Sequence, residues 1–316
     1  MLCARENEVL LWARDPEVVE SINREHRNPR YLSEAALPTA LRATRDLAET
    51  LAAAELVICA VPSHSVREVM SQAAPWLVGD PIVVSTVKGI ELDTGMTMHQ
   101  VLEDVLPARH HPRIVCLSGP SFAAEIAQRL PTVVTLACRE EAYAISVQST
   151  LSCPWFRCYS STDVIGVEMG GALKNVIAIA IGIGDGQRMG HNSRAALMTR
   201  GLAEITRLGT RAGAKPSTFL GLSGMGDLLL TCTGDLSRNR RLGLALGEGR
   251  SLDKTLHAMD GVVEGVETTR AACQLAERLG VELPISNMVR QVIDGERTPR
   301  EAGEALMTRQ LRSEQD

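Results

Sequence analysis

The sequence has few aromatic residues and no strong excess of charge of either sign. Phe, Trp and Tyr make up only 3% of the 316 residues, so the core that a chain of this length can bury must be aliphatic and rich in alanine. Lys and Arg number 33 against 38 Asp and Glu, which gives a formal net charge of −5. This balance argues against a nucleic-acid binder and against a membrane-surface binder.

Paired cysteines, a signal peptide and an uncharged apolar run long enough to span a membrane are also missing. The eight cysteines are scattered and none forms a C-x-x-C pair, so the sequence indicates neither a metal site nor a disulfide framework. Free thiols are typical of a reducing compartment. We therefore expect a cytoplasmic protein without a bound metal.

The apolar pattern changes character near the middle of the chain. Residues 9–12, 56–61, 82–86, 114–118 and 132–136 read as short buried strands, with helical patterns such as 16–24, 65–74 and 141–151 between them. Such alternation is typical of a parallel sheet covered on both faces. From about Thr162 onward only helical patterns occur, such as 192–212 and 268–279. The sequence predicts an α/β domain over residues 1–160 and an all-helical domain over 161–316.

One long apolar helix, over residues 166–186, contains a lysine. Gly170 and Gly171 leave room for a close approach to its backbone. Lys174 follows them in the apolar stretch, and a buried ammonium usually pairs, loses its proton or does chemistry. The alternative is that Lys174 extends along a half-exposed helix to reach water.

Polar residues follow the expected strands at their carboxyl ends, where open parallel sheets bind ligands. These are Arg14, the segment 62–64 with His64, Lys88, and the turn 118–121 that leads into a helix at 122–127. A helix start after such a turn offers free N–H groups to an anion. Alternatively, the turn is an ordinary helix start, Lys88 a surface lysine and His64 a hydrogen-bonded loop residue.

A compact basic cluster, residues 237–241, lies in the helical half. Its sequence, Ser-Arg-Asn-Arg-Arg, suits a phosphate because guanidinium groups bind oxyanions through two parallel hydrogen bonds. The alternative is a solvated basic turn. In an acidic chain, one small cluster suits a small anionic substrate better than a polymer.

Eight segments together resemble one known family, the NAD(P)-dependent glycerol-3-phosphate dehydrogenases of bacteria. They follow the family's order along the chain and are residues 11–15 (LWARD), 60–63 (AVPS), 88–91 (KGIE), 117–123 (LSGPSFA), 170–178 (GGALKNVIA), 224–227 (GMGD), 231–239 (TCTGDLSRN) and 262–265 (VVEG). The resemblance implies an α/β fold of a Rossmann-like parallel sheet domain followed by an all-helical substrate domain, a homodimer, and NADP or NAD as cofactor.

The resemblance also implies site residues. Lys174 is expected to be the catalytic acid/base. The substrate is expected to contact Lys88, Gly119, Ser121, Lys174, Asn175, Asp227, Ser237, Arg238 and Asn239. The nucleotide is expected to contact Arg14, Lys88, Ala123, Arg238, Val262 and Glu264. Arg14 slightly favours the 2′-phosphate of NADPH, whereas Asp15 would favour the free hydroxyl of NADH.

One departure from the family concerns the start of the chain. The family opens with a strand and a G-x-G-x-x-G loop for the pyrophosphate, but this sequence has no such motif. Gly182, Gly184 and Gly186 follow a helix rather than a strand and do not replace it. We therefore expect the first domain to lack this strand and loop. The preferred explanation is a start site assigned too far downstream, and the alternative is a real loss of the segment.

The expected function is the interconversion of dihydroxyacetone phosphate and sn-glycerol 3-phosphate with NAD(P)H, which supplies phospholipid synthesis. One alternative is a catalytically silent binder of a phosphorylated metabolite that has lost its cofactor loop. Another is a reductase of the same two-domain plan that acts on a different hydroxy acid. Lys174 and Lys88 argue against the silent binder, since a binder needs no proton donor.

Overall fold

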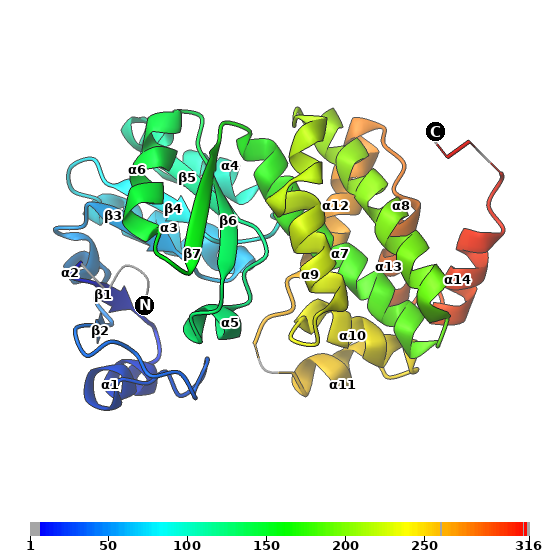
Figure 1. The fold of residues 1–316 in the computed structure, drawn as a ribbon, viewed down its shortest axis with the longest axis horizontal. Helices are drawn as coiled ribbons and strands as arrows, with labels where there is room; N and C mark the ends of the chain where they lie inside the picture. Colours follow the sequence, from blue (N-terminus) through cyan, green and yellow to red (C-terminus); the bar gives the residue numbers. More distant parts are fainter. Residues whose placement is uncertain (1–6, 260, 312, 315–316) are drawn as a thin grey trace. The chain divides into compact units, whose positions relative to one another are not determined.

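The computed structural model describes residues 7–259, 261–311 and 313–314, which form two compact units (Figure 1). The first unit comprises Met1–Val87 and Met98–Val164, and the second comprises Lys88–Thr97 and Ile165–Asp316. The domain change expected at residue 160 falls just before the first long helix of the second unit. The apolar pattern of the sequence does not indicate that Lys88–Thr97 belongs to the second unit.

The first unit contains a five-stranded sheet and a separate two-stranded sheet. The larger sheet has the spatial order β3 (Leu56–Cys59), β4 (Ile82–Ser85), β5 (Ile114–Ser118), β6 (Thr132–Ala137) and β7 (Phe156–Ser161). The smaller sheet pairs β1 (Leu10–Trp12) with β2 (Arg42–Thr44) in parallel. All five expected strands form, whereas the short, polar β2 and the half-exposed β7 were not expected.

The larger sheet is not parallel throughout. The pairs β3–β4, β4–β5 and β6–β7 are parallel, but β5 pairs antiparallel with β6, with Leu117 opposite Leu136. The connection from β5 to β6 contains only the five-residue helix α5 (Ala123–Ala127). A parallel crossover needs a helix long enough to return along the strand, so the chain turns back instead.

Helices of the first unit follow the apolar pattern. They are α1 (Pro16–Glu25), α2 (Leu47–Leu51), α3 (Val66–Ala73), α4 (Met98–Val105), α5 and α6 (Glu141–Leu151). Val84, Val115 and Val134 of the larger sheet are fully buried in a core to which α6 contributes Ala144 and Val147. Most of the buried side chains in this core are aliphatic, and Phe156 is the aromatic residue among them.

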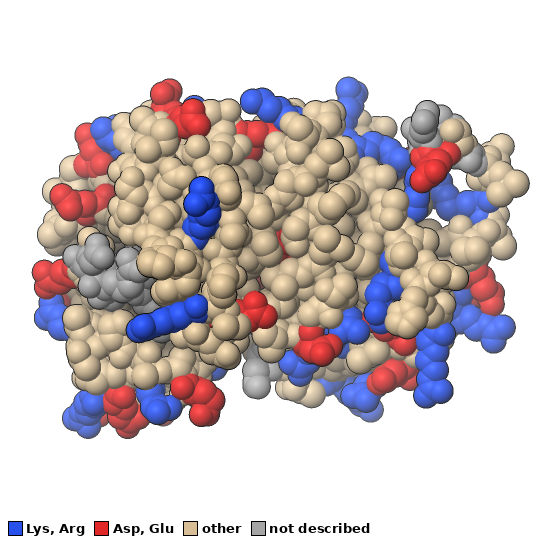
Figure 2. Space-filling model, in the orientation of Figure 1, with Lys and Arg blue, Asp and Glu red and all other residues tan. Residues whose placement is uncertain are grey.

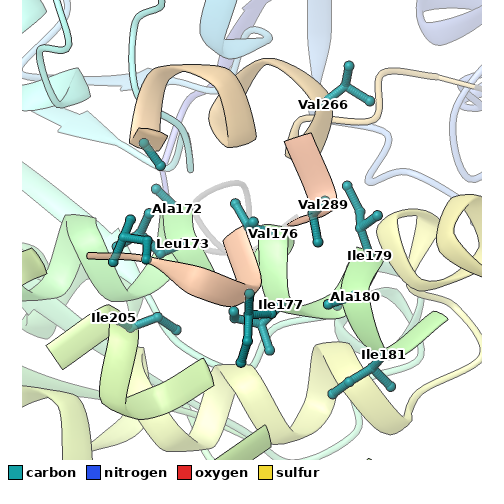
Figure 3. Close-up of a cluster of buried hydrophobic side chains, with 14 of the residues drawn as sticks. Ala172, Leu173, Val176, Ile177, Ile179, Ala180, Ile181, Ile205, Val266 and Val289 are labelled. Carbon is teal, nitrogen blue, oxygen red and sulfur yellow. The ribbon is translucent and has the colours of Figure 1, made fainter. Parts of the chain in front are cut away.

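The second unit consists of helices around one central helix, α7 (Val164–Gly186). The others are α8 (Gly190–Arg211), α9 (Asp227–Thr233), α10 (Arg238–Gly247), α11 (Leu252–His257), α12 (Gly265–Leu279), α13 (Pro284–Ile293) and α14 (Pro299–Met307). Figure 3 shows Val176, Ile177 and Ile181 of α7 among side chains from the surrounding helices. Burial of α7 on several sides explains its lack of a polar face.

Among the described residues, α7 is the helix that is long and apolar enough to cross a membrane. Its mean hydropathy is 1.6, but 94% of that stretch is buried inside the protein. A core helix has this composition for the same reason as a membrane helix, since both lie in apolar surroundings. On the face drawn in Figure 2, acidic and basic side chains are interspersed.

Candidate active site

Lys174 lies in the core of the second unit. It is on α7 between the buried residues Leu173 and Val176, and its side chain is only 8% exposed. Extension of the ammonium to water is therefore not how this lysine is accommodated. Its charge is met by polar groups from other segments.

Two residues of α9 hold the ammonium of Lys174. Its Nζ donates hydrogen bonds to Oδ1 of Asp227 and, over 2.9 Å, to Oγ1 of Thr231. Thr231 donates in turn to the backbone carbonyl of Asp227 over 2.6 Å. Asp227 and Thr231 are four residues apart on α9 and so share one face of the helix. The sequence analysis expected Asp227 here but did not single out Thr231.

A close backbone contact brings α9 to this position. The segment Leu222–Gly226 forms a π-helical turn directly before Asp227. A Cβ atom on Gly170 would lie 2.5 Å from the backbone oxygen of Ser223, so only glycine permits this approach to α7. Gly170 precedes Lys174 by one helical turn. The close approach that the sequence predicts at this glycine is confirmed.

Lys88 completes the group of charges. Its Nζ lies 2.7 Å from Oδ2 of Asp227, the oxygen that Lys174 does not use. The segment Lys88–Thr97 is anchored to the second unit because Ile90 is buried in its core and Arg278 donates to the carbonyl of Thr94 over 2.7 Å. Lys88 is therefore not a free surface lysine.

The electrostatics of this group tune both partners. Burial and the positive charge of Lys88 lower the pKa of Lys174 from 10.5 to about 8, against the opposing effect of Asp227. Burial raises the pKa of Asp227, but the two ammonium groups outweigh it and hold that pKa below its usual value. The arrangement therefore contains an ionised carboxylate and an amine that exchanges its proton near neutral pH.

A second set of hydrogen bonds starts from Asn175, the neighbour of Lys174. Its Oδ1 accepts from Nδ2 of Asn239 over 2.9 Å, and Oδ1 of Asn239 accepts from the backbone N–H of Gly265 over 2.9 Å. A Cβ atom on Gly265 would lie 2.6 Å from that oxygen. The expected nucleotide contacts Val262 and Glu264 lie in the half-buried segment just before Gly265.

The basic cluster 237–241 forms the start of α10. Ser237 caps the helix by accepting from the N–H of Arg240 over 3.2 Å. Arg238 is exposed, and its guanidinium makes no ion pair or hydrogen bond within the part of the chain that the structure describes. Arg240 instead binds Asp185 and Asp235. The guanidinium of Arg240 is therefore occupied by two carboxylates, unlike that of Arg238.

Four expected site residues belong to the first unit. Arg14 is exposed directly after β1, and Ala123 is the exposed first residue of α5. Gly119 has φ of +135°, a conformation that favours glycine, and Ser121 donates to its carbonyl over 2.9 Å. These residues lie at carboxyl ends of strands, as expected. Their contacts with substrate or nucleotide stay predictions.

The site does not coincide with the large hollow of the second unit. That hollow, of about 2170 Å³, is lined by α8, α13, α14 and the end of α7, and by none of the expected site residues. Nor do the described residues contain a group of three or more His, Cys, Asp or Glu that could hold a metal ion. Lys88, Lys174 and Asp227, which bind one another, therefore remain the candidate catalytic group of the second unit.

Comparison with known proteins points to one family. The chain matches two family models, NAD-dependent glycerol-3-phosphate dehydrogenase N-terminus over residues 1–144 and C-terminus over residues 163–304. It is 53% identical to glycerol-3-phosphate dehydrogenase [NAD(P)+] of Myxococcus xanthus, over 97% of this chain and 92% of the relative. The relative of that name from Citrifermentans bemidjiense is 49% identical, over 99% of this chain and 94% of its own length.

A solved structure agrees with these relatives. The crystal structure of glycerol-3-phosphate dehydrogenase from Coxiella burnetii has a TM-score of 0.92 at 35% identity. The match covers 98% of this chain and 94% of that chain. The likeness therefore extends over both units.

Proposed function

The chain belongs to the family of NAD(P)+-dependent glycerol-3-phosphate dehydrogenases, and we propose that it interconverts dihydroxyacetone phosphate and sn-glycerol 3-phosphate through the Lys174 site. The observation that carries the site assignment is the buried Lys174, whose pKa of about 8 suits proton exchange at the pH of a cell. A catalytically silent binder would have no use for such a group.

Lys174 acts as the general acid in ketone reduction. The nicotinamide cofactor supplies a hydride when bound. Negative charge then grows on the carbonyl oxygen of the substrate, and the ammonium of Lys174 donates a proton to that oxygen. Asp227 keeps this ammonium charged and oriented, while Lys88 adds a second positive charge beside the developing alkoxide. In the reverse direction neutral Lys174 removes the hydroxyl proton of glycerol 3-phosphate.

The start of α10 binds the phosphate of the substrate. Arg238 offers an unpaired guanidinium there, and the helix N-terminus adds backbone N–H groups and a partial positive charge. Asn239 is hydrogen-bonded to Asn175, the residue after Lys174. The start of α10, which binds the phosphate, is therefore connected to the helix that carries the catalytic lysine.

The exposed residues after β1 fit a nicotinamide nucleotide that carries a 2′-phosphate. Asp15 is engaged, because its carboxylate caps α1 by accepting from the N–H of Glu17 over 2.9 Å and pairs with Arg30 over 3.2 Å. Arg14 makes no hydrogen bond or ion pair to the described residues and remains able to bind a phosphate. The enzyme therefore uses NADPH in preference to NADH. Arg14→Ala should weaken NADPH binding more than NADH binding in a nicotinamide fluorescence titration.

Oxidation of NADPH at 340 nm with dihydroxyacetone phosphate tests the function directly. Turnover that requires both the phosphorylated ketone and Lys174 supports it. Binding of phosphate or nucleotide without turnover, by folded protein, would favour the silent binder instead. We also propose a cytoplasmic homodimer, as the family resemblance implies, and sedimentation velocity of the purified protein tests the dimer.

A further inference from the structure

Two glycines near the end of α7, Gly182 and Gly186, allow a second helix to pack directly against its backbone. Cβ atoms on Gly182 and Gly186 would lie 2.1 Å from the backbone oxygen of Arg240 and 2.4 Å from that of Leu244. From the other side, a Cβ atom on Gly243 of α10 would lie 2.1 Å from the backbone oxygen of Ile179. The backbones of α7 and α10 are therefore in direct contact.

These contacts show that the two helices run in the same direction. Gly182 meets Gly243, and four residues further along, Gly186 meets Gly247. Following α10 back to its first turn leads to Asn239, which is bonded to Asn175 of α7. The phosphate-binding start of α10 thus lies alongside the turn of α7 that carries Lys174.

An acidic residue between the glycines ties α10 to α7. Oδ2 of Asp185 accepts from Nε of Arg240 over 3.0 Å and lies 2.9 Å from its Nη2. Oδ1 accepts from Nε and Nη2 of Arg194 on α8, over 3.0 and 2.7 Å. Both oxygens of Asp185 are used, and its side chain is only 11% exposed. Each guanidinium directs two nitrogens at one oxygen of Asp185, and hydrogen bonds between such charged groups are stronger than those between neutral groups.

The two kinds of contact constrain different movements. Backbone contact at glycines fixes how closely α7 and α10 approach. Glycines have no side chains, however, that would stop one helix from sliding along the other or rotating against it. The bonds from Asp185 to Arg240 fix the position of α10 along and about its axis. Arg240 is three residues from Ser237, so a shift of Arg240 moves the phosphate-binding turn by a similar amount.

We propose that Asp185 is a positioning residue, which through Arg240 sets the distance between the phosphate-binding start of α10 and the ammonium of Lys174. The proposal rests on the proposed function, because it concerns the substrate phosphate. In this arrangement Asp185 never touches the substrate. It determines whether a phosphate held at α10 leaves the ketone within reach of Lys174, and so selects for the length of the substrate.

The test compares Asp185→Asn with the wild-type enzyme on two substrates. For dihydroxyacetone phosphate, kcat/KM should fall about 10-fold or more, mainly through a higher KM. For dihydroxyacetone, which has no phosphate to place, kcat/KM should change less than about 2-fold. A purely structural role would instead lower the active fraction of the protein and reduce both substrates equally, which would overturn the proposal.

The chain offers a matched control and a second variant. Asp235→Asn removes a carboxylate 2.9 Å from the same Arg240, but Asp235 is 97% exposed, so its loss should leave both substrates unaffected. Arg240→Gln removes the other end of the bond, and the double variant with Asp185→Asn should be no worse than either single variant. Additive losses in the double variant would mean that Asp185 does not act through Arg240.

Failure of this inference and failure of the proposed function give different results. If wild-type protein does not reduce dihydroxyacetone phosphate, the function itself is wrong. If the wild type is active and Asp185→Asn matches it on the phosphorylated substrate, only the positioning role is wrong. Thermal melting of each variant shows whether enough folded protein is present for the kinetic comparison.

Discussion

The ammonium of Lys174 and the carboxylate of Asp227 form a hydrogen-bonded ion pair with side chains that are only 8% and 1% exposed. Two buried charges that are paired in this way normally stabilise each other and do not exchange protons near neutral pH. Here Lys88 binds the other oxygen of the same carboxylate, so two ammonium groups share one negative charge. Burial and, after it, the positive charge of Lys88 lower the pKa of Lys174, which turns a structural ion pair into an acid/base group.

Replacement of Lys174 by alanine should abolish most of the turnover while leaving substrate binding largely intact. A positioned acid/base contributes roughly 10²–10⁴-fold to a rate, so kcat should fall by that range. The affinity for glycerol 3-phosphate, measured by calorimetry, should change much less because Arg238 remains. Near-normal turnover of well-folded Lys174→Ala protein would remove this lysine from the mechanism.

The pH dependence of ketone reduction should report the pKa of Lys174. Reduction needs the ammonium form, whose fraction falls as pH rises through about 8. We therefore expect kcat/KM for dihydroxyacetone phosphate to decline about tenfold per pH unit on the alkaline side. The oxidation of glycerol 3-phosphate needs the neutral amine, so its kcat/KM should rise over the same range. A flat profile in both directions across pH 7 to 9 would contradict the assignment.

Removal of the charge of Lys88 should shift the pH at which kcat/KM for ketone reduction begins to decline, here called the alkaline limb. The positive charge of Lys88 lowers the pKa of Lys174 by repulsion. Lys88 also hydrogen-bonds to Asp227, whose negative charge would otherwise act on Lys174 alone. In Lys88→Met both effects disappear, the pKa of Lys174 rises, and the decline of kcat/KM should begin at higher pH than in the wild type. The variant will also be slower overall, which is why the position of the limb and not the rate is measured. An unmoved limb would show that Lys88 does not tune Lys174.

Arg238 and Arg241 allow a paired test of phosphate binding. Both are exposed arginines in the first turn of α10. A charge-assisted hydrogen bond is worth about 1.5–3 kcal/mol, so Arg238→Ala should raise KM for dihydroxyacetone phosphate roughly 10- to 100-fold. Arg241→Ala removes the same charge three residues further on and should change KM little. Equal losses in the two variants would indicate a general effect of charge rather than a phosphate site at Arg238.

Much of the fold follows from the apolar pattern, because continuous apolar runs must be buried. The strand Ile114–Ser118 and the helix Glu141–Leu151 form where such runs predict them. The antiparallel pairing of β5 with β6 was not predicted, because both segments are short apolar runs whose composition does not show the direction in which they pair. The strand Arg42–Thr44 was missed because three mostly polar residues give no periodic signal.

The candidate site was predictable in part for a similar reason. Lys174 stands out because a charge in an apolar helix requires an explanation. The bond between Asp185 and Arg240 gives no such signal, because it joins residues 55 positions apart and nothing in either segment shows that the two side chains meet. The same holds for Thr231, whose hydroxyl matters only because α9 packs against α7. Contacts between distant helices are a property of the packing rather than of local composition.

Two glycines of α7 provide the last prediction, which concerns how Asp227 reaches Lys174. In Gly170→Ala the new methyl group would lie 2.5 Å from the backbone oxygen of Ser223, and backbone cannot move aside cheaply. The π-helical turn before Asp227 must then shift, so we expect a lower melting temperature and a lower kcat. In Gly184→Ala, on the same helix, the methyl group would lie an ordinary 3.5 Å from Cδ1 of Leu197. Since alanine favours a helix by up to about 1 kcal/mol over glycine, this variant should be as stable as the wild type or more so, with unchanged kcat. Thermal melting and steady-state kinetics on the two variants test the idea, which fails if both alanines have the same effect.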